Sequence, residues 1–196
     1  MPVIFLWIPA LLLVATAAGM LISRDWRWSL GLLAAQYFAA FWLVFSRWPL
    51  TMSASVLVGG WMAAAVLGMT QINIKDQPAA EASWPEGRLF RIFAAGLALL
   101  AVTAAMPSLS SLLPNGEQPV IWGALVLISL GLLHLGMTLQ PLRVILGLFT
   151  VLAGFEIIFS TLENSILVAG LLTVVVLGLA LTGSTLLILQ NSEKPA

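Results

Sequence analysis

The sequence predicts an all-α fold, a polytopic membrane helix bundle with seven transmembrane helices. Of the 196 residues, 61% are hydrophobic and 8% are charged, whereas a soluble domain carries roughly 25% charged residues. Apolar runs recur along the chain, and their length of about 18 to 25 residues crosses a hydrocarbon core of about 30 Å. Lys and Arg together number 8, as do Asp and Glu, so no basic surplus is present to attract nucleic acid.

The apolar runs follow one another from the N-terminus. They cover approximately residues 3–22, 29–46, 50–70, 89–106, 120–139, 142–162 and 165–190. The first run contains Ala15-Thr16-Ala17, which resembles a signal-peptide cleavage site. Because it lacks a basic segment before it and is long enough to span a bilayer, we predict that it is the first transmembrane helix.

Charged, aromatic and proline residues mark the breaks between the runs. They occupy residues 24–28, 47–49, 71–88, 107–119, 140–141 and 163–164. Most breaks are very short, so neighbouring helices are expected to pack as antiparallel hairpins. The longest break contains Ser83-Trp84-Pro85-Glu86, in which the serine predicts a helix cap and the proline suits a first helical turn. We interpret this break as a cytoplasmic linker with Trp84 as an interfacial anchor.

The basic residues predict the orientation, because cytoplasmic loops accumulate Lys and Arg. Because successive spans cross the membrane in opposite directions, the helix ends divide into two sets, one at each surface. One set holds only Arg47. The other set holds Arg24, Arg27, Lys75, Arg88, Arg91, Arg143 and Lys194. The N-terminus is therefore predicted outside and the C-terminus inside, and we expect a multi-pass protein of the cell inner (plasma) membrane.

A short internal repeat suggests a duplicated bundle. The pattern R-x-x-L-G-L begins at Arg27 and again at Arg143, each time in the second span of a three-span group. We predict a first three-helix unit over residues 1–74, a cytoplasmic linker, fourth helix and external loop over 75–118, and a second three-helix unit over 119–196. Chance similarity is the alternative for so short a motif. Both arginines are expected to anchor their spans at the cytoplasmic surface.

Glu156 is the residue on which the prediction of function depends. It lies near the middle of the run over residues 142–162, where an ionised carboxylate costs several kcal/mol unless it is paired, hydrated or neutralised. In the repeat register Glu156 corresponds to Ala40, so the first unit has no acid there. Gln36 lies one turn nearer the cytoplasmic end than Ala40, and we interpret it as hydrogen-bonding between helices.

Thr150, Ser160 and His134 are further candidates for proton transfer. The two hydroxyls lie near Glu156 in the sequence and can stabilise either protonation state of the acid. The alternative for Glu156 is a permanently protonated side chain hydrogen-bonded to a neighbour. His134 lies near the cytoplasmic end of its span, about 20 Å from the depth of Glu156. It can exchange protons with Glu156 only through a chain of water molecules. The alternative is that His134 lies at the membrane interface or serves in helix packing.

The chain offers little other chemistry. Cysteine is absent and histidine occurs once, which excludes disulfides, iron–sulfur clusters, thiolate zinc sites and paired-histidine haem ligation within this chain. No nucleophile and base pair, phosphate loop or metal-ligand cluster is recognisable in the sequence. We therefore expect no catalytic, cofactor-binding or metal-binding residue here, and any redox chemistry would belong to a partner.

The last three spans resemble subunit K of NADH-quinone oxidoreductase (complex I). In size the whole chain resembles the related seven-helix membrane component E of group 4 hydrogenases. The resemblance rests on Arg143 before the middle helix and on Gly154-Phe155-Glu156-Ile157 within it. It implies that Glu156 belongs to a chain of buried ionisable residues that carries protons through the membrane. Ser160 stands where the family commonly has Asn, and Leu179 stands near the place of the family's second intramembrane Glu.

We therefore expect a membrane subunit of a multi-subunit, redox-driven complex that translocates protons or cations. Its partners would be the lipid bilayer and other membrane subunits of a redox or antiporter complex, which would hold any quinone, flavin or iron–sulfur clusters. The chain itself would be non-catalytic. Two alternatives remain open. One is a purely structural assembly subunit in which Glu156 is neutral and inert. The other is a stand-alone small-solute transporter, which requires broken helices and convergent polar groups around a cavity.

Overall fold

The computed structural model describes residues 4–23, 25–74, 87–112 and 117–192, and within them every regular element is an α-helix. The helices are α1 (Ile4–Ile22), α2 (Trp26–Phe45), α3 (Leu50–Asn73), α4 (Arg88–Leu112), α5 (Gln118–Gly136), α6 (Pro141–Leu162) and α7 (Ile166–Ser192). Each of these 7 helices is long and apolar enough to cross a membrane. The predicted seven-helix membrane bundle is therefore confirmed.

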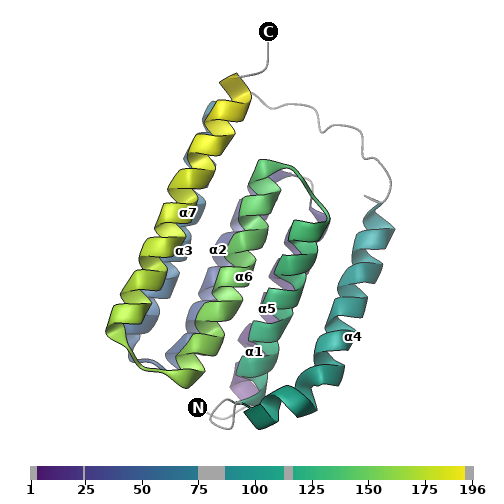
Figure 1. Ribbon diagram of the computed structural model, residues 1–196, viewed down its shortest axis with the longest axis vertical. Coiled ribbons are helices and arrows are strands. Elements are labelled where there is room, and N and C mark those ends of the chain that lie inside the picture. The colour runs from purple at the N-terminus through teal and green to yellow at the C-terminus, as the bar shows by residue number, and fades with distance from the viewer. Residues whose placement is uncertain (1–3, 24, 75–86, 113–116, 193–196) are drawn as a thin grey trace.

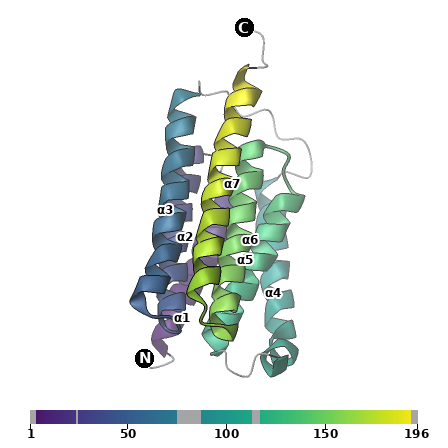
Figure 2. The same ribbon diagram turned by 60° about the vertical axis from the view of Figure 1, so that its left-hand side comes forward.

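The helices form two layers (Figure 1 and Figure 2). One layer contains α1, α2 and α3, and the other contains α4 to α7. Across the layers α1 packs on α5, α2 on α6 and α3 on α7, while α4 lies at the edge against α5 and touches α1 only weakly. Consecutive helices run in opposite directions, so facing helices run in the same direction (Figure 1). The duplication of a three-helix unit stays a prediction.

Capping residues and prolines explain where several helices begin. Asp25 precedes α2, and its carboxylate accepts a hydrogen bond of 2.9 Å from the backbone N–H of Arg27. This satisfies one of the backbone donors that a helix start leaves without a partner. Pro119 and Pro141 lie in the first turns of α5 and α6, where a proline costs no hydrogen bond.

Helix α4 differs from its prediction. The sequence places a break over residues 107–119, but α4 continues through Pro107 to Leu112, so the first half of that predicted break is wrong. The end of α4 turns away from the main axis of the helix (Figure 1), as expected where a proline removes one backbone hydrogen bond. The predicted cap at Ser83-Trp84-Pro85-Glu86 lies outside the described residues.

Helices α5 and α6 pack closely along a row of glycines. A Cβ atom at Gly131 would lie 2.7 Å from Cγ2 of Val151, and one at Gly154 would lie 2.8 Å from the carbonyl oxygen of Ala124. Small residues let membrane helices approach each other and gain van der Waals contact. This contact fixes α6, the helix that carries Glu156, against α5.

Candidate functional site

Glu156 lies on the buried face of α6, about 9 Å from the end of that helix at Leu162 for a rise of 1.5 Å per residue. Only 2% of the side chain is exposed. Its Oε2 atom makes no hydrogen bond with the residues that the structure describes. A carboxyl group buried in this way is costly in its ionised form unless another group or water compensates its charge.

Tyr37 of α2 lies in the neighbouring layer, within electrostatic range of Glu156. It is fully buried and interacts electrostatically with the carboxyl group of Glu156. Its hydroxyl lies 3.5 Å from the carbonyl oxygen of Phe149, to which it donates a long hydrogen bond. The two aromatic rings meet edge to face, with centroids 6.5 Å apart. These contacts hold the phenol of α2 against the α6 segment that leads to Glu156.

Gly60 of α3 makes the position of Tyr37 possible. A Cβ atom at Gly60 would overlap the ring of Tyr37. The tyrosine ring therefore lies directly on the backbone of α3, and its hydroxyl points toward α6. Sequence reasoning missed this pair, although the chain has a single tyrosine and that tyrosine lies in the middle of an apolar span.

Gln36 does not make the hydrogen bond predicted for it. The side chain is completely buried, and neither its amide nitrogen nor its amide oxygen has a partner among the described residues. Gln36 precedes Tyr37 in the sequence and so points about 100° away from it around α2. The interpretation of this amide as an interhelical hydrogen bond is therefore wrong for the described part of the chain.

Ser160 and Thr150 are both buried, but their hydroxyls are engaged within α6. Ser160 donates to the carbonyl oxygen of Ile157 at 2.7 Å, and Thr150 donates to that of Leu146 at 2.8 Å. Neither hydroxyl donates to Glu156. Ser160 shares a helix face with Glu156, because residues four apart lie one above the other, whereas Thr150 points about 120° away. Of the two residues, only Ser160 lies on the same face of α6 as the acid.

His134 lies with two arginines at the other end of the bundle. It is 3% exposed, so it is packed among other side chains of the protein, and it interacts electrostatically with Arg143 and Arg91. Arg143 donates a hydrogen bond of 2.9 Å to the carbonyl oxygen of Ser23. Arg27 is exposed, with its guanidinium 5.3 Å from the centroid of the Trp26 ring. Nothing in these contacts joins His134 directly to Glu156.

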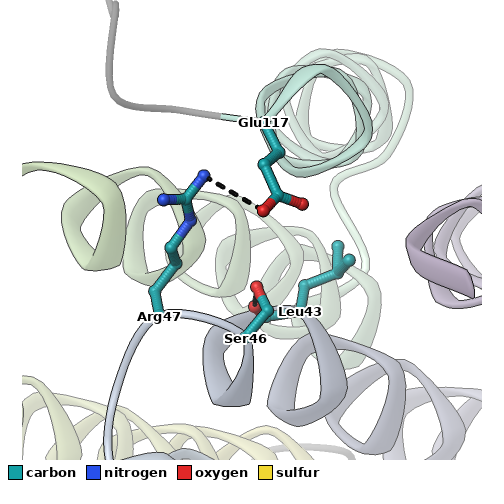
Figure 3. A network of polar contacts seen from close by, with 4 residues as sticks. All are labelled: Leu43, Ser46, Arg47 and Glu117. Carbon is teal, nitrogen blue, oxygen red and sulfur yellow. Dashed lines mark hydrogen bonds and ion pairs between the residues drawn. The ribbon is translucent and has the colours of Figure 1, made fainter. Parts of the chain in front are cut away.

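The end of the bundle near Glu156 carries an ion pair between loops. Arg47 follows α2 and lies 3.7 Å from the carboxylate of Glu117, which precedes α5 (Figure 3). Trp48 donates from its indole nitrogen to the carbonyl oxygen of Glu163 at 3.0 Å. These contacts join the α2–α3 turn to the start of α5 and the end of α6. They stabilise the surface at this end and leave Glu156 in the interior.

The described residues contain no group of three or more His, Cys, Asp or Glu side chains that could hold a metal ion. The chain matches no known family model, no curated protein and no solved structure. The chemistry of the site must therefore be judged from its own residues. A buried carboxyl group beside a phenol can exchange a proton, because each group can donate and accept a hydrogen bond when the acid is neutral.

Proposed function

We propose that this protein is a non-catalytic membrane subunit of a multi-subunit, redox-driven complex that translocates protons or cations, and that Glu156 forms part of the proton path. The observation that carries the proposal is a buried carboxyl group that lies within electrostatic range of Tyr37 and whose Oε2 atom has no hydrogen-bond partner among the described residues. Ionisable residues inside membrane spans are rare and usually mark ion or proton pathways. The resemblance of the last three spans, residues 119–196, to subunit K of complex I agrees with this role.

The electrostatic interaction of Glu156 with Tyr37 supports a path that crosses from one layer to the other. Glu156 belongs to α6 and Tyr37 to α2, and these helices face each other across the layers. A phenol can donate to a carboxylate and can accept from a carboxylic acid. The tyrosine therefore offers a second polar group near Glu156 in a chain that has Leu179 in place of the family's second acid. In this proposal the chain receives a proton from one neighbouring subunit and passes it to another.

The apolar surface of the bundle supports the proposal that this chain is a subunit surrounded by lipid and by the apolar helices of other subunits. Helices α4 and α7 are the least buried of the spans, and they expose large apolar side chains. Examples are Phe93, Leu100, Leu171 and Leu181. We place the protein in the inner (plasma) membrane, with quinone, flavin and iron–sulfur clusters in its partners.

A structural assembly subunit is the second candidate function. Gln36 and the Oε2 atom of Glu156 have no hydrogen-bond partners among the described residues, and Ser160 and Thr150 bond within their own helix. A continuous hydrogen-bonded chain is thus not formed by these side chains alone. A solute transporter has less support, because α6 runs unbroken past Glu156, whereas transporter sites are typically built from discontinuous helices.

The experiment is the Glu156→Gln substitution in the complex purified from its native membrane. Glutamine keeps the shape of a neutral glutamic acid but cannot release a proton. We expect normal assembly and a proton-to-electron stoichiometry below that of the wild type. Glu163→Gln is the matched control, because Glu163 is exposed just beyond α6, and it should leave both quantities unchanged.

Two results would decide against a proton path. Normal stoichiometry with normal assembly in Glu156→Gln would show that the acid carries no proton, in favour of the assembly role. Copurification of this chain without any redox or antiporter subunit would contradict the proposed complex itself. Lost proton translocation with normal assembly would exclude the purely structural role.

A further inference from the structure

A basic cluster, composed of Arg91, His134 and Arg143, lies at the end of the bundle where α1 and α5 finish and α4 and α6 begin; Arg91 and His134 are buried and Arg143 is half-buried. Arg91 donates a hydrogen bond of 3.1 Å from its Nη1 atom to the carbonyl oxygen of Leu21. Arg143 donates from its Nη2 atom to Ser23, two residues further along the same helix end. His134 interacts electrostatically with both arginines. Three helices thus place basic side chains around the C-terminal end of α1.

The charge of Arg91 is not balanced by the residues that the structure describes. Arg91 is 6% exposed, forms no ion pair with those residues, and its Nε atom has no hydrogen-bond partner among them. The end of α1 supplies the equivalent of only about half a negative charge. The Nε2 atom of His134 is likewise buried without a partner. A buried cation without a counter-ion is strongly unfavourable, so this arrangement calls for an anion.

We propose that the basic cluster binds a phosphate group, supplied by the headgroup of an anionic phospholipid. Guanidinium groups recognise phosphate oxygens through charge-assisted hydrogen bonds, and an imidazole N–H can add another. Basic pockets between membrane helices at the surface rich in Lys and Arg are suited to lipid headgroups. The inference does not depend on the proposed proton path, which lies at the other end of α6.

The arrangement of α4 gives a lipid a route to the cluster. Helix α4 lies at the edge of the bundle (Figure 1) and packs mainly on α5, with only weak contact to α1. Arg91 points from α4 toward the end of α1. A lipid beside α4 can therefore place its acyl chains along this helix and its phosphate between α4 and α1.

The test uses the full chain, depleted of lipid in a neutral maltoside detergent. Binding of dioleoylphosphatidylglycerol is measured by native mass spectrometry and by the shift in thermal unfolding temperature, with dioleoylphosphatidylcholine as the zwitterionic lipid. Sodium phosphate is compared with sodium chloride at equal ionic strength to detect a soluble anion. We expect preferential binding of the anionic lipid, and a dissociation constant about tenfold higher in Arg91→Gln, the loss expected for one charge-assisted hydrogen bond.

The matched control is Arg27→Gln, which removes a positive charge from the same end of the bundle at an exposed position. It should keep the affinity of the wild type for the anionic lipid. His134→Asn should weaken binding less than Arg91→Gln does. If Arg91→Gln fails to fold, Arg91→Lys serves instead, because lysine keeps the charge but lacks the Nε donor and the planar geometry. It should also bind the lipid more weakly than the wild type.

Three results would overturn the proposal. Equal loss in Arg27→Gln and Arg91→Gln would show diffuse attraction to a charged surface rather than a site. Stabilisation by inorganic phosphate with no binding of phosphatidylglycerol would identify a soluble anion as the ligand. Lipid binding that appears only after Asp76, Glu81 and Glu86 are neutralised would show that carboxylates of this chain occupy the cluster.

Discussion

The ring of Tyr37 fills the space that a side chain at position 60 would need, so α2 and α3 meet through a tyrosine and a glycine. This contact determines where the tyrosine hydroxyl lies. With the ring pressed against the backbone of α3, the hydroxyl reaches the carbonyl oxygen of Phe149 and the neighbourhood of Glu156. Three helices therefore define the surroundings of the buried acid.

We expect Gly60→Ala to destabilise the protein, because the added methyl group overlaps the ring of Tyr37 and the helices must move apart. Overpacking of this kind typically costs about 1 to 3 kcal/mol. Thermal unfolding in detergent measures the loss. Gly96→Ala in α4 is the control, since a Cβ atom there would meet no atom within 4 Å. Equal stability of the two variants would show that Tyr37 does not pack on Gly60.

Tyr37→Phe separates the hydroxyl from the ring. The edge-to-face contact with Phe149 should survive, so we expect normal assembly and a loss of stability of about 1 kcal/mol for one hydrogen bond. Proton translocation by the parent complex should fall if the phenol takes part in the path. In the double variant with Glu156→Gln the fall should be no greater than in Glu156→Gln alone, because residues that act in one step are not additive. Independent, additive losses would place Tyr37 outside that step.

The spans were predictable because membrane crossing depends on length and apolarity, which the sequence displays directly. Helix α6, predicted over residues 142–162, is observed over Pro141–Leu162. The end of α4 was less predictable. Pro107 predicts a break, but a proline interrupts only one hydrogen bond, and the helix continues beyond it with a bend.

The surroundings of Glu156 were only partly predictable. The repeat register placed the acid opposite Ala40, which is one turn from both Gln36 and Tyr37. That register gives the depth of a residue in the membrane but not the direction in which its side chain points around the axis of α2. This direction decides which side chain faces α6. The sequence indicated an interhelical hydrogen bond for Gln36 and no role for Tyr37, whereas packing against Gly60 directs the tyrosine to the site. Arg91 was missed for a similar reason, because sequence alone assigned it a role in orientation only.

Gly154→Ala tests the close packing of α5 on α6. The new Cβ atom would lie 2.8 Å from the carbonyl oxygen of Ala124 and 2.8 Å from Cγ1 of Ile128. The Cβ atom would collide with backbone atoms of α5, which cannot turn aside as a side chain can. The helices must therefore separate, at a cost of about 1 to 3 kcal/mol. We expect a lower unfolding temperature and lower yield, while Gly170→Ala, where a Cβ atom meets nothing within 4 Å, should be close to the wild type. Unchanged stability in Gly154→Ala would contradict the α5–α6 contact.

The orientation of the bundle is testable with fused reporters. Arg27, Arg91 and Arg143 lie at one end of the helices, whereas Arg47 lies at the other, where it pairs with Glu117 (Figure 3). Because cytoplasmic ends accumulate basic residues, a reporter after Lys194 and one within residues 75–86 should both be cytoplasmic. A reporter within residues 113–116 should be external, and accessibility of the fused domains to protease added outside the cell measures this. A C-terminal reporter on the outside would reverse the orientation and place the basic cluster of Arg91, His134 and Arg143 at the external surface.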